Sequence, residues 1–317
     1  MRLASVAALL LVVACEHADS GVARGQAAAD TTASVWLQRA AAHPEIASWL
    51  YLRAAADTPD SSARRALYAH VTLPLARGRV PWVEAAALAH FGDTLSAIRA
   101  YGALPAPVTV FRLRAATDTA ARDSVRTELL GFIASSQSGD AVREATGLFD
   151  KLFANPTAAE QLVIARAAAR FGMWPRARAG FDATPEAQLG AADRFALATA
   201  LVRTNMNARA ARVFATIQSP TALAAAARYQ RALALLNSGD GAGARAALRA
   251  TAEAVSDTSA AAALSLLADL QTDDGDDAGS RQTLLTLVRR FPRTRFTAPA
   301  RFDAALVALI LGETSAA

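Results

Sequence analysis

The chain has few of the residues on which several fold classes depend. Its 317 residues include one cysteine, so no disulfide can form within the chain. Aromatic residues make up only 6%, although hydrophobic residues make up 53%, because alanine supplies much of the apolar content. Sustained two-residue alternation, the pattern of a half-buried strand, is also missing. Alanine favours helices over strands, so the composition predicts an all-α fold with close helix contacts.

The apolar run at the N-terminus is too short to cross a membrane. Leu3 to Ala14 spans 12 residues, whereas a bilayer-spanning helix needs about 20. With Arg2 before it, the run predicts a signal peptide over residues 1–14. It ends in Leu11-Val12-Val13-Ala14-Cys15, which resembles the lipobox of bacterial lipoproteins. That resemblance implies lipid attachment at Cys15, an ordinary cleaved signal with a chance cysteine being the alternative.

These features predict where the protein resides. Residues 15–33 lack periodic apolar side chains, so we expect a flexible tether there. We expect a lipid-anchored protein of the bacterial cell envelope, in the periplasm. In the lipoprotein class, Glu16 after the cysteine is compatible with transfer to the outer membrane.

Lysine is nearly absent, since Lys151 is the only lysine among 33 basic residues, and the net charge is +5. We interpret this preference for arginine as codon usage in a GC-rich genome, with a nucleic-acid-binding surface as the alternative. No arginine run coincides with a nucleic-acid-reading motif, and an exported protein does not meet cytoplasmic nucleic acid. We therefore expect no nucleic-acid partner.

A period of 33 to 36 residues runs through the second half of the chain. Each copy has a small residue, a turn, a second small residue 12 positions later and a large apolar residue four positions after that. The copies are Ala165, Ala177 and Phe181; Ala198, Ala210 and Phe214; Ala232, Ala244 and Leu248; Ala268, Ser280 and Leu284. Two antiparallel helices approach closely only where both carry small side chains, and the large residue fills the groove to the next pair. The spacing therefore predicts stacked helix pairs.

Copies of the pair also precede this region. Ala85, Ala97 and Tyr101 obey the same spacing around Phe91-Gly92-Asp93, and residues 119–154 predict a looser pair with Phe149 as the large residue. Residues 34–72 predict three shorter helices, Ser34–Ala42, Pro44–Ala56 and Ser61–Val71. Their expected buried residues are Trp36, Trp49, Leu50, Leu52, Leu67 and Val71.

The spacing resembles a degenerate tetratricopeptide repeat. Phe291-Pro292 matches the terminal proline of that repeat, whereas the first three copies lack it. Residues 34–317 are thus predicted to form an all-α solenoid, a right-handed superhelix of helix pairs.

Several phrases resemble the N-terminal superhelical domain of soluble lytic murein transglycosylases. They are Trp49-Leu50-Tyr51-Leu52-Arg53-Ala54-Ala55, Val80-Pro81-Trp82-Val83-Glu84-Ala85, Phe91-Gly92-Asp93, Arg289-Arg290-Phe291-Pro292 and Ala298-Pro299-Ala300-Arg301-Phe302. The likeness covers most of the chain from about residue 34. It implies a helical arm that holds a separate peptidoglycan-cleaving domain. The family's catalytic glutamate stands in a Glu-Ser-x-Phe context, and no glutamate here is followed by serine. The resemblance therefore transfers no catalytic residue.

Other chemistry has weak support in the sequence. The four histidines are scattered without metal-ligand spacing, and both Gly239–Gly243 and Asp273–Asp277 fall at predicted inter-helix turns. We expect no metal, cofactor or self-contained active site. The densest basic cluster is Arg289, Arg290, Arg293, Arg295 and Arg301. It indicates either arginines that favour a helix C-terminus or a contact with glycan-peptide stems or a partner domain.

Two functions follow as expectations. The first is a non-catalytic arm of a peptidoglycan lytic transglycosylase whose catalytic domain lies beyond this chain. The second is a stand-alone repeat lipoprotein that binds other envelope proteins.

The C-terminus bears on this choice. Ala305 fits the small residue of a first helix, with a turn at Gly312-Glu313-Thr314, so Ala317 falls where a second helix presents its small residue. We expect Leu306, Leu309 and Ile310 to lack cover, and the reading frame to be truncated.

Overall fold

The computed structural model describes residues 25–312 apart from 118, 220 and 255–257. Within that part the chain is all-helical, without a strand. The predicted signal peptide, Cys15, the first part of the tether and Ala317 lie outside the described residues. The chain divides into two compact units. The first runs to Leu129 and includes Gly147–Leu152, and the second comprises Leu130–Thr146 and continues from Phe153.

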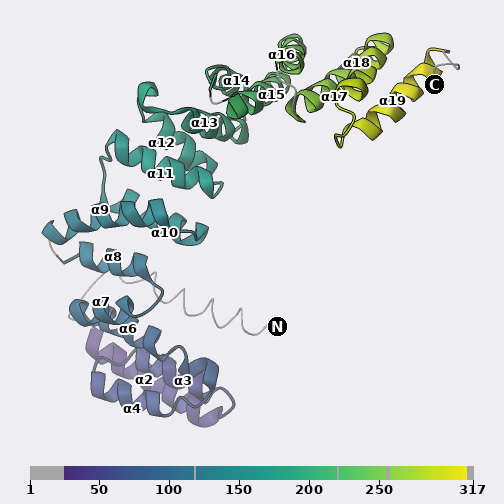
Figure 1. Cartoon of the computed structure of the whole chain (residues 1–317). Helices are drawn as coiled ribbons and strands as arrows, with labels where there is room; N and C mark the ends of the chain where they lie inside the picture. Colours follow the sequence, from purple (N-terminus) through teal and green to yellow (C-terminus); the bar gives the residue numbers. More distant parts are fainter. Residues whose placement is uncertain (1–24, 118, 220, 255–257, 313–317) are drawn as a thin grey trace. The chain divides into compact units, whose positions relative to one another are not determined.

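The first unit contains helices α2 to α8 (Figure 1, purple to blue). Their bounds are α2 Gly25–Ala42, α3 Ala47–Ala56, α4 Ser61–Ala69, α5 Pro74–Arg77, α6 Val80–His90, α7 Thr94–Gly102 and α8 Pro107–Ala115. Helices α9 (Thr119–Ser135) and α10 (Gly139–Leu152) are divided between the two units.

The three predicted N-terminal helices are confirmed with changed bounds. Helix α2 begins at Gly25 rather than Ser34, so residues 25–33 of the predicted tether are helical. Of the six residues expected to be buried here, Leu52 and Val71 are fully buried, and the other four are partly exposed.

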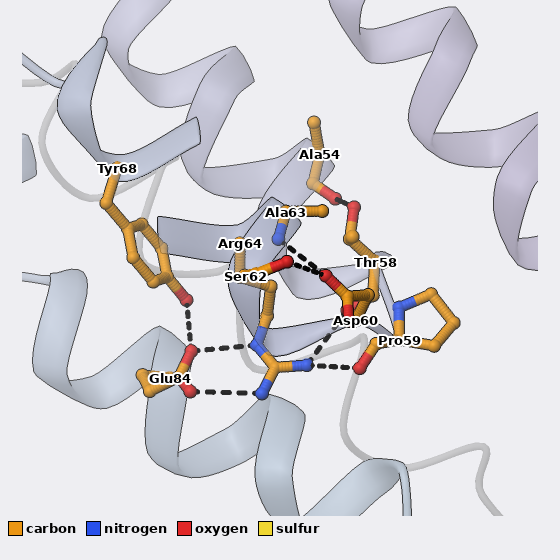
Figure 2. A network of polar contacts seen from close by, with 9 residues as sticks. All are labelled: Ala54, Thr58, Pro59, Asp60, Ser62, Ala63, Arg64, Tyr68 and Glu84. Atoms are coloured by element: carbon orange, nitrogen blue, oxygen red, sulfur yellow. Dashed lines mark hydrogen bonds and ion pairs between the residues drawn. The ribbon is translucent and has the colours of Figure 1, made fainter. Parts of the chain in front are cut away.

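A buried ion pair joins α4 to α6 (Figure 2). Arg64, 2% exposed, donates from Nε and Nη2 to the Glu84 carboxylate at 2.8 and 3.0 Å. Its Nη1 donates to the carbonyls of Thr58 and Pro59 at 3.0 and 2.7 Å, and the Tyr68 hydroxyl donates to Glu84 at 2.9 Å. All these donors have acceptors, so the network fixes the α3–α4 loop and α4 against α6.

The second unit stacks helix pairs, with α9 and α10 contributing residues 130–146. The pairs are α11 Ala158–Arg170 with α12 Trp174–Asp182, α13 Ala191–Arg203 with α14 Asn207–Ala215, α15 Thr221–Asn237 with α16 Gly241–Ala254, and α17 Thr258–Asp273 with α18 Asp277–Arg290; α19 Thr297–Ile310 follows. Each helix packs against the next from α11 to α19 (Figure 1, teal to yellow). The predicted α-solenoid of helix pairs is therefore confirmed.

One turn geometry recurs between paired helices and explains the period. In each turn a residue with positive φ lies seven positions after the first small residue: Gly92, Gly172, Asn205, Gly239 and Gly275, with Gly312 in the same place after Ala305. In the first five turns the next residue donates its N–H to the carbonyl five positions earlier, as Asp276 does to Gln271 at 2.8 Å. This is the Schellman motif, which satisfies the end of the first helix.

The residue directly after the positive-φ residue also caps the start of the second helix in three of these turns. Asp93, Asp240 and Asp276 each accept an N–H from the residue three positions later, which caps the helix. One residue thus ends one helix and begins the next, so the small residues meet at a fixed offset.

The predicted small residues are the points of closest contact. All ten in the five matched pairs are at most 1% exposed, and the five large residues range from buried Leu248 to partly exposed Tyr101. A Cβ added to Gly180 of α12 would lie 2.9 Å from the Ala165 Cβ of α11. Residues 119–154 do form two helices, α9 and α10, with Phe149 fully buried, but Gly139 lacks the positive φ of the other turns.

Candidate functional site

A groove between α11 and α13 has a volume of about 550 Å³. Its lining residues are Arg166, Ala169, Arg170, Trp174, Ala192, Asp193, Ala196 and Thr199. Its size falls within the range of ligand sites, about 300–1,000 Å³. All its residues belong to the second unit, on rigid helices rather than on a long loop.

An ion pair links the two helices at this groove. Arg166 donates from Nε and Nη2 to the two Asp193 oxygens at 2.7 and 2.8 Å. Asp193 is 7% exposed and also accepts the Gly190 N–H at 3.2 Å. The hydrogen bonds from Arg166 are the main cause that lowers the pKa of Asp193, partly opposed by its burial. The Arg166 side chain remains 56% exposed, so it also borders the groove.

The other arginine of the groove is held by backbone. Arg170 donates from Nη1 to the carbonyl of Ala134 at 3.1 Å and from Nη2 to that of Ser136 at 2.8 Å. These groups lie at the C-terminal end of α9, where a cation favours the helix dipole. Its guanidinium also lies 4.8 Å from the Phe171 ring centroid. Both arginines thus have partners, but only Arg166 is paired with a carboxylate, so Arg170 keeps its net positive charge at the groove.

The remaining surface of the groove is apolar. Ala169, Ala192 and Ala196 contribute small side chains, and partly buried Trp174 lies in the first turn of α12. Thr199 donates its hydroxyl to the Phe195 carbonyl at 2.8 Å, so its oxygen can still accept a hydrogen bond. A concave apolar surface with a few fixed polar groups is typical of a binding site.

Sequence reasoning did not find this groove. Arg166 and Thr199 occupy the same repeat position, six residues before the positive-φ residue of the turn. That register was visible in the sequence and would have marked both as outward-facing. The Arg166–Asp193 contact, by contrast, depends on how two neighbouring pairs stack.

The five predicted contact arginines lie at the end of α18, in the loop after it and in α19. All five are exposed, but Arg290 donates to the Ala252 carbonyl at 2.8 Å, near the C-terminal end of α16, and stacks on Phe291. Arg295 stacks on Phe296, with its guanidinium 4.9 Å from the ring centroid. Arg290 therefore does interact with a helix C-terminus, but that of α16 rather than that of its own helix, which the sequence interpretation had named.

Both glycine- and aspartate-rich segments are turns, as predicted. Asp240 and Asp276 cap the following helices, and Asp274 pairs with Arg245 at 2.6 Å. Within the described part of the chain, no three His, Cys, Asp or Glu residues are placed to hold a metal. In the same residues no helix is long and apolar enough to cross a membrane.

No protein-family model matches the chain, and no curated protein matches it either. The resemblance to the lytic transglycosylase arm thus stays a prediction that depends on the short phrases alone. The fold and the groove are the observations from which a function must be argued.

Proposed function

We propose that this chain is a helical-repeat scaffold that binds a segment of a partner protein in the α11–α13 groove. The supporting observation is the groove itself, which is mostly apolar, edged by Trp174 and lined by two arginines whose guanidinium groups already have hydrogen-bond acceptors. Such a surface favours an apolar or aromatic side chain, and Thr199 offers an acceptor for a backbone N–H. Because the groove is already fixed, only the bound segment loses conformational entropy on binding.

Selection from a random 12-residue peptide display library tests this proposal. We expect enriched peptides that share an apolar or aromatic residue. Their affinity should fall at least tenfold with Trp174→Ala, which removes the aromatic edge, and with Ala196→Glu, which places a charge on the apolar floor. Ala222→Glu, on an exposed position of α15, is the matched control and should change nothing. Equal losses in Ala196→Glu and Ala222→Glu would reject the groove as the site.

We also propose attachment to the bacterial envelope through a lipid at Cys15, supported by the lipobox-like Leu11–Cys15 segment. Metabolic labelling with a clickable fatty acid should mark the wild type and not Cys15→Ser. Equal label in the two proteins would reject lipidation at this residue.

A second candidate is the arm of a peptidoglycan lytic transglycosylase. Exposed Arg293 and Arg301 support it, because neither arginine forms a hydrogen bond or an ion pair within the described residues. Arg293→Glu with Arg295→Glu should weaken sedimentation with purified sacculi, whereas Arg249→Glu, exposed on α16, should not. Unchanged sedimentation would reject this contact. Anhydro-muropeptides released by this chain would instead show an active site within it.

A further inference from the structure

A second groove in the second unit carries more positive than negative charge. It has a volume of about 460 Å³ and lies among α12, α13 and α14. Its charged lining residues are Arg194, Arg209, Arg212, Asp182 and Glu186. Three arginines against two carboxylates leave one positive charge in excess at neutral pH.

The excess charge is not shared equally among the three arginines. Arg209 donates from its two terminal nitrogens to the two Asp182 oxygens at 3.2 and 2.5 Å, so this pair is neutral. Within the described part of the chain, neither Arg194 nor Arg212 forms a hydrogen bond or an ion pair. Glu186 is exposed and pairs with neither of them. The groove therefore holds two guanidinium groups that lack an acceptor.

Arg194 is the more unusual of the two. Its Nε is buried and has no hydrogen-bond partner, while the side chain as a whole is partly exposed. Buried donors nearly always have an acceptor, so an exception requires an explanation. Arg212 is exposed and lies three residues after Arg209 on α14, which places both on one face of that helix. Each of the two unpartnered groups is open to an acceptor supplied by a ligand.

Apolar side chains line the same groove. Phe181, Leu189 and Leu197 are at most 6% exposed, and Val213 is partly buried. A ligand that fits must therefore combine a negative charge with an apolar part. The single excess charge matches one carboxylate, whereas a phosphate group carries about −1.5 to −2 near neutral pH. Guanidinium and carboxylate also match in geometry, since both are planar and pair through two parallel hydrogen bonds.

We propose that the groove among α12, α13 and α14 binds a carboxylate of a peptide segment, with a neighbouring apolar side chain of that segment on the groove floor. Arg194 and Arg212 would donate to the carboxylate. This site is separate from the α11–α13 groove, because Arg194 lies on a different side of α13 from Ala196 and Thr199. The proposal therefore does not depend on binding in that first groove.

The test uses the full chain and a rhodamine-labelled Ser-Leu-Glu-Leu-Ser peptide with both ends blocked. Fluorescence anisotropy should show saturable binding that weakens as salt is added, and the peptide with glutamine in place of glutamate should bind at least fivefold more weakly. Arg194→Gln and Arg212→Gln should each weaken binding of the glutamate peptide at least fivefold. Arg203→Gln is the matched control, since Arg203 is an exposed arginine of α13 outside the groove, and it should change nothing. A Ser-Leu-Leu peptide with a free C-terminus distinguishes a terminal carboxylate from a side-chain carboxylate as the bound group.

A second variant tests the site without removing an arginine. Glu186→Gln removes the one unpaired carboxylate of the groove and should therefore raise affinity for the glutamate peptide. Because Glu186 is exposed, the change should leave the fold intact, and circular dichroism checks this for every variant. Trp174→Ala, in the α11–α13 groove, should not alter binding of this peptide. Loss of binding in Trp174→Ala with full binding in Arg194→Gln would place the peptide in the first groove and reject the second site.

Three other outcomes would overturn the proposal. The first is equal affinity for the glutamate and glutamine peptides, and the second is equal weakening by Arg212→Gln and Arg203→Gln. The third concerns the class of anion. Displacement of the peptide by inorganic phosphate at a concentration at least tenfold below that of succinate would show a phosphate site instead of a carboxylate site.

Discussion

Glu84→Gln tests whether burial makes the Arg64 ion pair important for the first unit. The wild-type carboxylate accepts two hydrogen bonds from a guanidinium that is 2% exposed and one from Tyr68. The amide can accept from one donor but turns its own N–H₂ toward another. Removing one partner of a buried pair costs about 3–5 kcal/mol. Because Glu84 is 28% exposed and the amide keeps one acceptor, we expect about 2–3 kcal/mol.

The Arg114–Glu128 pair is a matched control in the same unit. It also has two hydrogen bonds from the guanidinium, here from Nη1 and Nη2 at 2.6 and 2.8 Å from the carboxylate, but its side chains are 30% and 44% exposed. Exposed pairs contribute at most about 1 kcal/mol. Glu128→Gln should therefore cost less than about 1 kcal/mol, although Arg114 is the main cause that lowers the pKa of Glu128 to about 2.

Urea unfolding followed by tryptophan fluorescence measures both variants. Trp36, Trp49 and Trp82 lie in the first unit and Trp174 in the second. A Trp174→Phe background therefore makes the signal report the first unit alone. Double-mutant cycles with Arg64→Met and Arg114→Met isolate each pair energy. Equal coupling energies for the two pairs would refute the argument from burial.

Acid should remove the stability that Glu84 contributes. Hydrogen bonds from Arg64 are the largest cause that lowers the pKa of Glu84 in the folded state. Its contribution is therefore complete above the unfolded pKa, about 4.3, and declines as pH falls through the folded value. Wild type and Glu84→Gln should converge in stability at low pH. A difference that persists unchanged below the folded pKa would contradict this linkage.

Three further predictions concern the second unit. Gly180→Ala should destabilise the unit by about 1–3 kcal/mol, because the new Cβ overpacks against Ala165. Gly131→Ala has open space around its Cβ and should stabilise α9 by about 0.5–1 kcal/mol. Urea unfolding followed by circular dichroism compares the two variants, and a change in stability of the same sign in both would contradict this prediction. Asp269→Asn should stabilise the protein at neutral pH, because burial and then two neighbouring carboxylates raise the pKa of Asp269 in the folded state. The gain in stability should vanish as pH falls below the pKa of this aspartate in the unfolded chain. A gain that is independent of pH would refute the prediction. Gly275→Ala should cost about 1–2 kcal/mol because its φ is 78°, and a thermal midpoint equal to wild type would contradict that.

The repeat was predictable because its determinants are local. Each turn needs a residue that tolerates positive φ and each close contact needs a small residue, and both occur at fixed offsets, as in Ala268, Gly275 and Ser280. Helices α5 and α8 were missed. Both are short and begin with proline at the first position, and proline marks a helix start as readily as a loop. Helix α2 was predicted nine residues too short, since its first half has no apolar period.

The candidate site was not predictable in the same way. The Arg166–Asp193 contact joins residues 27 apart on different pairs, so it depends on the stacking of neighbours and not on spacing within one pair. Arg290 shows the same limit, because its acceptor Ala252 lies 38 residues earlier. Local sequence spacing predicts the helix pairs, whereas contacts between neighbouring repeats decide which side chains form the groove.

Two adjacent positions in each first helix separate these roles. The residue seven before the positive-φ residue is alanine in all six first helices. The residue six before it is at least partly exposed in every case and differs in chemistry: Ala86, Arg166, Thr199, Leu233, Asp269 and Leu306. The first position therefore maintains contact between the helices, and the second sets the chemistry of the exposed surface.

Leucine substitutions at Ala198 and Thr199 test this division with the same new side chain. Ala198 is fully buried against α14, so Ala198→Leu should overpack the pair and cost about 1–3 kcal/mol or more. Thr199→Leu should stay within about 0.5 kcal/mol, since its side chain is partly exposed and surface changes are usually small. The binding of selected peptides should change in Thr199→Leu all the same, because the groove loses its acceptor. A stable Ala198→Leu, or a Thr199→Leu that loses stability while its peptide affinity is unaltered, would show that the two positions do not divide folding from recognition.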